Sequence, residues 1–195
     1  MEIKHSLRFV KPNRNRFKES FNTKQRTWTN PLDGQTFSLL HLNAFFLDVS
    51  YTKGGILKTV RARVTFSPHC YTRAKKRLDD DELIVVTEGY GPTSVDRVFD
   101  QERWLYSQSL PLLMKNIQNM SCKRDDDNQV VIHFSSRNRN RPGEGWYSFI
   151  RIQVDPKFPD ILQLEVRTTH RRPGHVSSSR YPIRFSQHLA DLLDD

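Results

Sequence analysis

The sequence predicts an α+β fold: a mostly antiparallel sheet of about six strands, one longer kinked helix and a short C-terminal helix. Polar and apolar residues alternate without a break from Thr59 to Phe66, as in a strand with one buried face. Short connections rich in Gly, Pro and Asp separate the strand candidates of the C-terminal half. Such connections favour antiparallel neighbours in a meander.

Two regions are predicted along the chain, a basic N-terminal arm at residues 1–34 and a single α+β domain at residues 35–195. The arm mixes charge with turn-forming residues, which is atypical of a core element. Its aromatic residues predict that the arm is partly docked on the body; they are Phe9, Phe17, Phe21 and Trp28. At 195 residues with 36% hydrophobic content, the chain is long enough to bury one core.

Residues 45–51 and 56–66 predict a β-hairpin with its turn at Gly54 and Gly55. Glycine supplies the positive φ that a tight hairpin turn requires. The second strand has one apolar face and one polar, basic face, and the polar face carries Thr59, Arg61, Arg63 and Thr65. One face of this strand is therefore expected in the core and the other in solvent.

A third strand is predicted at residues 83–86, and a helix follows it. Asp100 is placed to cap this helix, whose apolar residues recur at helical spacing as far as Met120. Pro111 either kinks the helix or begins a second one. Three more strands are expected at residues 129–135, 146–154 and 162–168, and a short amphipathic helix at 186–193.

Positive charge is concentrated at two places in a chain of net charge +9. Residues 1–30 carry eight Lys and Arg against two Glu, and residues 137–184 carry ten basic against four acidic residues. Each segment contains the tetrapeptide Asn-Arg-Asn-Arg. Clustered Lys and Arg neutralise phosphates and release counterions, so a polyanionic partner is expected.

The sequence lacks the common enzyme signatures: it has no P-loop, dinucleotide-binding fingerprint, nucleophile elbow or zinc-binding helix motif. Cys70 and Cys122 lie far apart and outside any ligand spacing, so both are expected to be reduced thiols. We therefore expect no cofactor and no metal. No apolar run approaches the roughly 18 residues of a membrane span, and the N-terminus lacks a secretory apolar core. A cytoplasmic protein without membrane contact follows.

Acidic runs at 79–82 and 125–127 lack EF-hand spacing. They are typical of solvated turns, or they contact the basic arm of this or another chain and shield a phosphate-binding surface until nucleic acid displaces them. A further charged group is explained by helix capping and ion pairs rather than by a substrate. It consists of Arg97, Asp100, Glu102 and Arg103.

The first candidate site follows the alternating strand. His69 and Tyr71 lie just beyond it, and the cations Arg73, Lys75 and Lys76 come next. A histidine titrates near neutral pH and transfers protons, while cations bind phosphate, so these are the parts of a metal-independent ribonuclease. The alternative is a polar turn in which His69 and Tyr71 satisfy backbone groups.

The second and third candidate sites lie in the basic C-terminal segment. The second is a strand end with its following loop, and it consists of His133, Arg137, Arg139, Arg141, Trp146 and Tyr147. Arginines fork onto phosphates, and Trp and Tyr rings stack on bases, a combination suited to single-stranded RNA. The alternative is a solvated hairpin loop. The third site, at one end of the same sheet, consists of His170, Arg171 and Arg172.

Two stretches carry a family resemblance: Arg63-Val64-Thr65-Phe66-Ser67-Pro68-His69-Cys70-Tyr71-Thr72, and Phe99-Asp100-x-x-Arg103-x-x-x-Ser107-x-x-Leu110-Pro111. Through them the chain resembles a bacterial family labelled stationary-phase growth adaptation proteins. The resemblance implies a bacterial setting, does not cover the basic arm, and transfers no catalytic role.

Three functions fit these residues. The first is a nucleic-acid-binding protein, for RNA rather than DNA, that acts through basic loops and aromatic stacking. Its predicted contacts are Arg61, Arg63, Arg73, Lys75, Lys76, Arg137, Arg139, Arg141, Trp146, Tyr147, Arg171 and Arg172. The second is a toxin-like, metal-independent endoribonuclease with His69, His133, His170 and Tyr71 in catalysis. The third is a component of a defence or toxin–antitoxin system whose basic surface meets an acidic protein.

Overall fold

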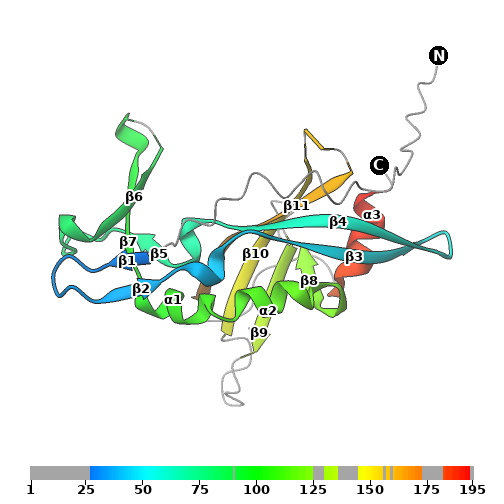
Figure 1. Ribbon diagram of the computed structural model, residues 1–195, viewed down its shortest axis with the longest axis horizontal. Helices are drawn as coiled ribbons and strands as arrows, with labels where there is room; N and C mark the ends of the chain where they lie inside the picture. The colour runs from blue at the N-terminus through cyan, green and yellow to red at the C-terminus, as the bar shows by residue number, and fades with distance from the viewer. Residues whose placement is uncertain are drawn as a thin grey trace.

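Figure 1 shows the computed structural model, which describes residues 27–89, 91–124, 130–135, 145–155, 157–158, 160–172 and 182–193. The described residues form an α+β fold, as the sequence predicts. A large sheet makes up the body, and a small sheet and a two-stranded hairpin lie together at the left of the figure. No described helix is long and apolar enough to cross a membrane.

The large sheet contains seven of the described strands, in the order β12-β8-β9-β10-β11-β4-β3. They are β3 (Phe45–Lys53), β4 (Ile56–Phe66), β8 (Ser121–Arg124), β9 (Val130–Ser135), β10 (Gly145–Val154), β11 (Ile161–Arg172) and β12 (Ile183–Arg184). Neighbours are antiparallel except β11 and β4, which run parallel. The prediction of about six mostly antiparallel strands is wrong on both points. The chain passes through the small sheet and the helices before β11 returns beside β4, and short connections cannot reveal such a crossover.

The hairpin of β3 and β4 forms where the sequence predicts it. Gly54 and Gly55 have φ angles of 55° and 76°, in the left-handed region that favours glycine. Alternation along β4 is also confirmed, with buried Val60, Ala62 and Val64 between half-buried Arg61 and Arg63.

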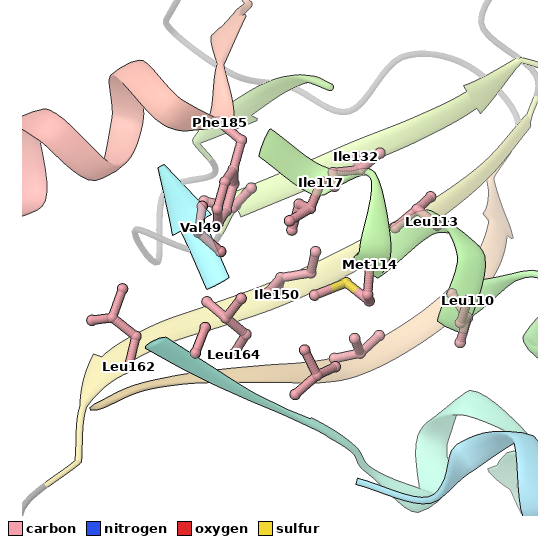
Figure 2. Packing of buried hydrophobic residues seen from close by; sticks show 14 of the residues in the cluster. Val49, Leu110, Leu113, Met114, Ile117, Ile132, Ile150, Leu162, Leu164 and Phe185 are labelled. Atoms are coloured by element: carbon pink, nitrogen blue, oxygen red, sulfur yellow. The ribbon is translucent and has the colours of Figure 1, made fainter. Parts of the chain in front are cut away.

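One face of the large sheet carries the main core (Figure 2). The short helix α2 (Leu110–Lys115), the 3-10 turn η5 (Ile117–Asn119) and the C-terminal helix α3 (Phe185–Leu192) contribute to it. Its fully buried side chains include Val49, Leu110, Met114, Ile117, Ile132, Ile150, Leu162, Leu164 and Phe185. Burying each large apolar side chain stabilises the fold by about 1.5–3 kcal/mol, so this face anchors the sheet.

The predicted kinked helix is two short helices. The first, α1 (Gln101–Ser107), begins after Asp100, whose Oδ1 accepts a hydrogen bond from the Arg103 N–H at 2.9 Å. The capping prediction is confirmed. The second, α2, begins at Leu110 with Pro111 in its first turn, where the missing N–H leaves no helical hydrogen bond unmade. Pro111 therefore begins a second helix rather than kinking one. The position of α3 agrees with the predicted C-terminal helix.

The predicted third strand belongs to a separate sheet, in which β5 (Thr72–Ala74) and β6 (Ile84–Glu88) flank β7 (Val95–Phe99). At the end of β7, Phe99 stacks on Trp28 with ring centroids 4.1 Å apart. Trp28 lies in β1 (Thr27–Thr29), which pairs with β2 (Thr36–Ser38). The last part of the predicted arm therefore packs on the body, and residues 1–26 lie outside the described residues. Single 3-10 turns complete the structure: η1 (Leu40–Leu42), η2 (Pro68–Cys70), η3 (Asp81–Leu83) and η4 (Gly91–Thr93).

Candidate nucleic-acid interface

Three neighbouring strands end together at one end of the large sheet. Gly145, the first residue of β10, lies opposite Ser135, the last of β9, and opposite Arg172, the last of β11. The described residues on either side of segment 136–144 therefore lie beside the point where β11 ends. We call this end, marked by Ser135, Gly145 and Arg172, the arginine end. The predicted residues Arg137, Arg139 and Arg141 belong to segment 136–144 and lie outside the described residues, as does the Arg172 side chain.

Two of the predicted catalytic histidines share a row across the sheet near the arginine end. His133 of β9 and His170 of β11 lie opposite Tyr147 of β10, one on each side. Adjacent strands are about 4.8 Å apart, so the backbones of the two histidines are about 10 Å apart. The His170 ring stacks on Phe149 with centroids 5.2 Å apart, and its Nδ1 lies 3.3 Å from Thr168 Oγ1. The His133 side chain is outside the described part of the structure.

The two rings predicted to stack on bases are buried. Trp146 is 4% exposed and stacks on Tyr106 of α1 at a centroid distance of 3.6 Å, and Tyr147 is 3% exposed. Both lie in β10, the middle strand of the described sheet, where residues 145–150 are buried on both faces. Neither ring offers a face to a base in this arrangement. Arg171, beside them in register, is exposed.

The face of the large sheet opposite the core carries further arginines. Arg61 and Arg63 lie there as predicted, and Arg151 of β10 joins them. Arg61 NH1 is 3.5 Å from Asp48 Oδ1, and Arg151 NH1 is 3.9 Å from Glu165 Oε2. Such solvent-exposed pairs contribute little stability, so both guanidinium groups can exchange partners. Sequence reasoning missed Arg151, although alternation along β10 beyond the buried Ile150 places it on this face.

His69 lies on η2, outside the row of His133 and His170. Ser67 caps this turn, and its Oγ accepts a hydrogen bond from the His69 backbone N–H at 3.2 Å. The imidazole Nε2 contacts both carboxylate oxygens of Glu88, at 2.6 and 2.9 Å. Glu88 ends β6, and only the packing of the small sheet against η2 brings it to His69. No spacing in the sequence could have indicated this pair.

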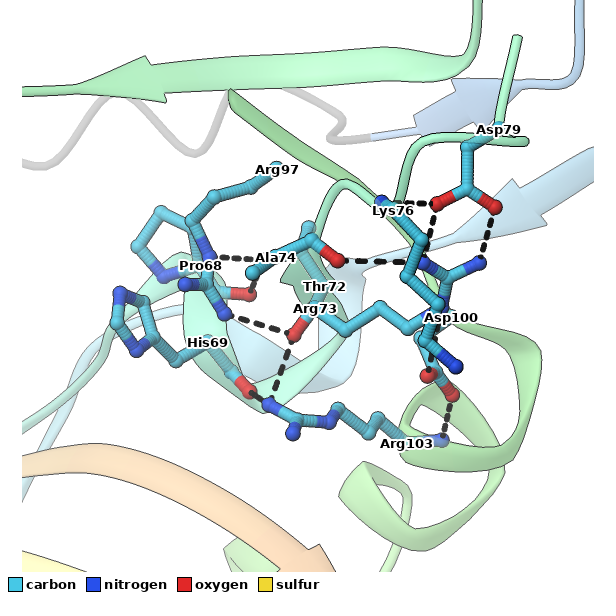
Figure 3. Close-up of polar contacts among 10 residues, drawn as sticks. All are labelled: Pro68, His69, Thr72, Arg73, Ala74, Lys76, Asp79, Arg97, Asp100 and Arg103. Atoms are coloured by element: carbon cyan, nitrogen blue, oxygen red, sulfur yellow. Dashed lines mark hydrogen bonds and ion pairs between the residues drawn. The ribbon is translucent and has the colours of Figure 1, made fainter. Parts of the chain in front are cut away.

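Two arginines hold the turn that carries His69 (Figure 3). Arg103 NH1 donates to the carbonyl oxygens of His69 and Thr72 at 3.1 and 2.9 Å. Arg97 donates from Nε to Thr72 Oγ1 at 2.9 Å and from NH2 to the Thr72 carbonyl at 3.0 Å. Burial lowers the pKa of both guanidinium groups from its ordinary value. Three of these four hydrogen bonds go to backbone carbonyls, which agrees with the interpretation of this segment as structural, and Arg97 NH1 also lies 3.7 Å from Glu88 Oε2.

The predicted phosphate-binding cations of β5 pair with the acidic run that follows them. Arg73 donates from NH1 and NH2 to the Asp79 carboxylate at 2.5 and 2.7 Å, and Lys75 Nζ lies 2.7 Å from Asp81 Oδ1. The hydrogen bonds from Arg73 hold the pKa of Asp79 well below its usual range. The exposed Lys76 donates its backbone N–H to Asp79 Oδ2 at 2.6 Å. The run at 79–82 thus pairs with the cations that precede it in the chain, whereas most of the basic arm that it was expected to contact, residues 1–26, lies outside the described residues.

The residues beside His69 belong to the core. Cys70 is fully buried, burial raises its thiol pKa to about 12, and Sγ donates to the Val166 carbonyl at 3.4 Å. The Tyr71 ring packs against the main core. Burial also raises the pKa of Cys122 to about 11, and both cysteines are free thiols. Protonated, buried thiols are inert as nucleophiles. Within the described ranges, no group of three His, Cys, Asp or Glu residues is placed to hold a metal ion.

Comparison with protein families matches the model of the YjaZ family to residues 21–193. This range takes in the arginine end, the small sheet and the His69 turn. Comparisons with curated proteins and with solved structures give no match.

Proposed function

The chain belongs to the YjaZ family, and we propose that it binds nucleic acid, with single-stranded RNA as the ligand, at the arginine end of the large sheet. The register of three strands carries this proposal. Gly145 lies between Ser135 and Arg172, so the two residues that flank segment 136–144 lie beside the end of β11.

Charge is the first support for this proposal. Segment 136–144 contains three arginines and one glutamate, and β11 ends in Arg171 and Arg172. Antiparallel pairing places the flanks of the first stretch, Ser135 and Gly145, at the same end of the sheet as Arg172. A concentration of guanidinium groups at one place favours a chain of phosphates over a single carboxylate, since each phosphate contact releases condensed counterions.

The choice of RNA over duplex DNA follows from the available groups. Trp146 and Tyr147 are buried, so stacking on bases falls to arginine guanidinium planes and to the half-buried His170 ring. Planar cations stack on unpaired bases, and the guanidinium group of arginine also forms bidentate hydrogen bonds to phosphates. The described part of the arginine end presents no recognition helix that would enter a major groove. A flexible single strand can expose its bases to such groups.

Salt titration of RNA binding tests the proposal. A variant with Arg137, Arg139 and Arg141 changed to Gln is compared with the wild type on a single-stranded RNA oligonucleotide. Each phosphate contact contributes about 0.7 to the slope of log affinity against log salt, so losing three contacts flattens the slope by about 2.

The matched control removes the same charge at the opposite end of the sheet, by changing Lys53, Lys58 and Lys157 to Gln. Lys53 and Lys58 flank the β3–β4 turn, and Lys157 lies in the β10–β11 connection. The control should keep the wild-type slope. Binding that is absent, insensitive to salt, or equally weakened in both variants would refute the proposal.

A second function, metal-independent RNA cleavage, has one observation in its favour, the pair of His69 and Glu88. Because Glu88 engages Nε2, the other ring nitrogen, Nδ1, is left for proton transfer. In this scheme Nδ1 takes the proton of a ribose 2′-hydroxyl and the 2′ oxygen attacks the phosphorus. The P–O5′ bond then breaks, and the departing 5′ oxygen takes a proton from solvent.

Incubation of RNA with the protein in EDTA distinguishes this function from binding alone. Fragments ending in 2′,3′-cyclic phosphate that disappear with His69→Ala, while binding persists, would support it. The variant Glu88→Gln should reduce cleavage, because His69 Nε2 loses the carboxylate that orients the ring. Intact RNA in all samples leaves binding as the function.

A further inference from the structure

The large sheet has an outer edge at β3, the last strand in the described order. Between this edge, η5 and α3 lies a pocket with a volume of about 390 Å³. It is lined by Ser50, Tyr51, Thr52, Leu57, Gln118, Asn119, Ser186, Gln187 and Ala190. Such a volume lies within the range of about 300–1,000 Å³ that is typical of ligand sites.

The lining is rich in hydrogen-bonding side chains and carries no formal charge among the described residues. Six of the nine residues are Ser, Thr, Asn or Gln, although 27% of the whole chain is charged. A buried charge without a partner is costly, so this lining disfavours phosphates, carboxylates and ammonium groups. Amide and hydroxyl groups instead match a ligand that has donors and acceptors but no charge.

The backbone of β3 contributes to the same place. The Ser50 N–H points away from β4 and reaches Gln118 Oε1 at 3.4 Å, a long hydrogen bond. Strand residues alternate in the direction of their backbone groups, so Thr52 also directs its N–H and C=O outward from the sheet. The edge therefore offers main-chain donors and acceptors opposite the amide groups of Gln118, Asn119 and Gln187.

Apolar surface adjoins the pocket. Leu57 lines it and is 71% exposed, and its neighbour Ile56 is 65% exposed. Both lie next to the β3–β4 turn. Since β4 runs parallel to β11, this turn is at the opposite end of the sheet from Arg172. The pocket is therefore separate from the arginine end.

We propose that this edge binds an extended, uncharged peptide segment of a partner protein, which adds to the sheet beside β3. Main-chain hydrogen bonds to the Ser50 carbonyl and to the N–H and C=O of Thr52 provide affinity, the amide side chains satisfy the peptide's remaining groups, and Leu57 contacts an apolar side chain. Strand addition of this kind uses unpaired edge groups and pockets for alternate side chains. The proposal goes beyond RNA binding and does not rest on it.

Selection of random octapeptides displayed on phage against the full chain tests this proposal. The enriched peptides should be neutral and rich in Thr, Val, Ile, Asn and Gln. Synthetic copies should bind at least tenfold more weakly to Gln118→Glu, which keeps the acceptor for Ser50 but adds charge to the pocket. The control is Gln101→Glu, the same change at an exposed position in α1. If Gln118→Glu does not fold, as judged by circular dichroism, Asn119→Asp replaces it.

N-methylation of the peptide backbone tests whether the peptide binds as an added strand. Successive peptide residues direct their N–H groups to opposite sides. N-methylation at one set of alternate residues should abolish binding, and at the other set should leave it within about threefold. The proposal would be overturned if no peptide or only charged peptides were enriched, or if both methylation sets had equal effects. Displacement of the peptide by uridine or maltose at low millimolar concentration would also overturn it.

Discussion

The substitution Asp79→Asn should strengthen RNA binding, because it releases a cation that the folded chain now neutralises. Asp79 accepts both hydrogen bonds of the Arg73 fork, at 2.5 and 2.7 Å, and a third from the Lys76 N–H at 2.6 Å. Asparagine keeps one acceptor oxygen but has no charge. The Lys76 contact can therefore persist while the guanidinium loses the closer of its two carboxylate partners; the other, Asp100 Oδ2, lies 3.6 Å from Arg73 Nε.

The size of the effect follows from counterion release. If the released Arg73 gains one phosphate, the slope of log affinity against log salt becomes steeper by about 0.7 on single-stranded RNA. Over a tenfold decrease in salt, this slope adds about fivefold to the gain in affinity. A second substitution, Asp81→Asn, acts on Lys75 in the same way and should steepen the slope again, although the two effects are coupled because Asp79 also attracts Lys75.

Fluorescence anisotropy of a labelled RNA oligonucleotide at four or more salt concentrations measures the slope. The control Glu102→Gln raises the net charge by the same amount at an exposed position in α1. A slope that steepens in Asp79→Asn and not in Glu102→Gln supports shielding by the acidic run. Equal slopes in all three proteins, with Asp79→Asn folded, would refute the view that Asp79 withholds Arg73 from phosphate.

Three predictions concern the scaffold. Asp100→Ala should lower the free energy of unfolding by about 1 kcal/mol through loss of the α1 cap, seen as a lower urea midpoint. Met114→Ala should cost about 2–5 kcal/mol, because its fully buried side chain fills the core between α2 and the sheet. Burial lowers the pKa of His41, whose Nε2 lies 2.6 Å from Ser107 Oγ, so the unfolded chain binds more protons below about pH 6.5. Stability should therefore fall as the pH drops from 7 to 5, and less so in His41→Gln.

The elements that depend on local sequence were predictable. The alternation of β4, the glycine turn before it and the Asp100 cap each depend on residues within a few positions of one another. The parallel pairing of β11 with β4 depends on contacts about one hundred positions apart, and no local signal encodes it. For the same reason, a strand was predicted at residues 83–86, where β6 (Ile84–Glu88) lies, but it could not be assigned to a separate sheet.

The same difference between local signals and long-range contacts decides which features of the candidate sites could be predicted. Arg61 and Arg63 lie on the expected face because a period of two determines it. The His69–Glu88 pair joins a turn to the end of another strand and has no sequence signature. The burial of Trp146 and Tyr147, by contrast, could have been predicted from the sequence. Residues 146–150 form a continuous apolar and aromatic run interrupted only by Ser148, which is typical of a strand covered on both faces rather than of a loop edge.

The parallel pairing of β11 with β4, which the sequence did not predict, does not affect the arginine end. This site should therefore be tested first. Its formation requires only that β9, β10 and β11 are consecutive antiparallel neighbours, as their short connections indicate. In such a meander the loop between the first two strands and the end of the third must share one end of the sheet. The identity of the strand that pairs with the other edge of β11 does not alter that geometry. The end of β9, the start of β10 and the end of β11 therefore meet through local pairing alone. The substitution of Arg137, Arg139 and Arg141 thus tests the proposed site without depending on the long-range fold.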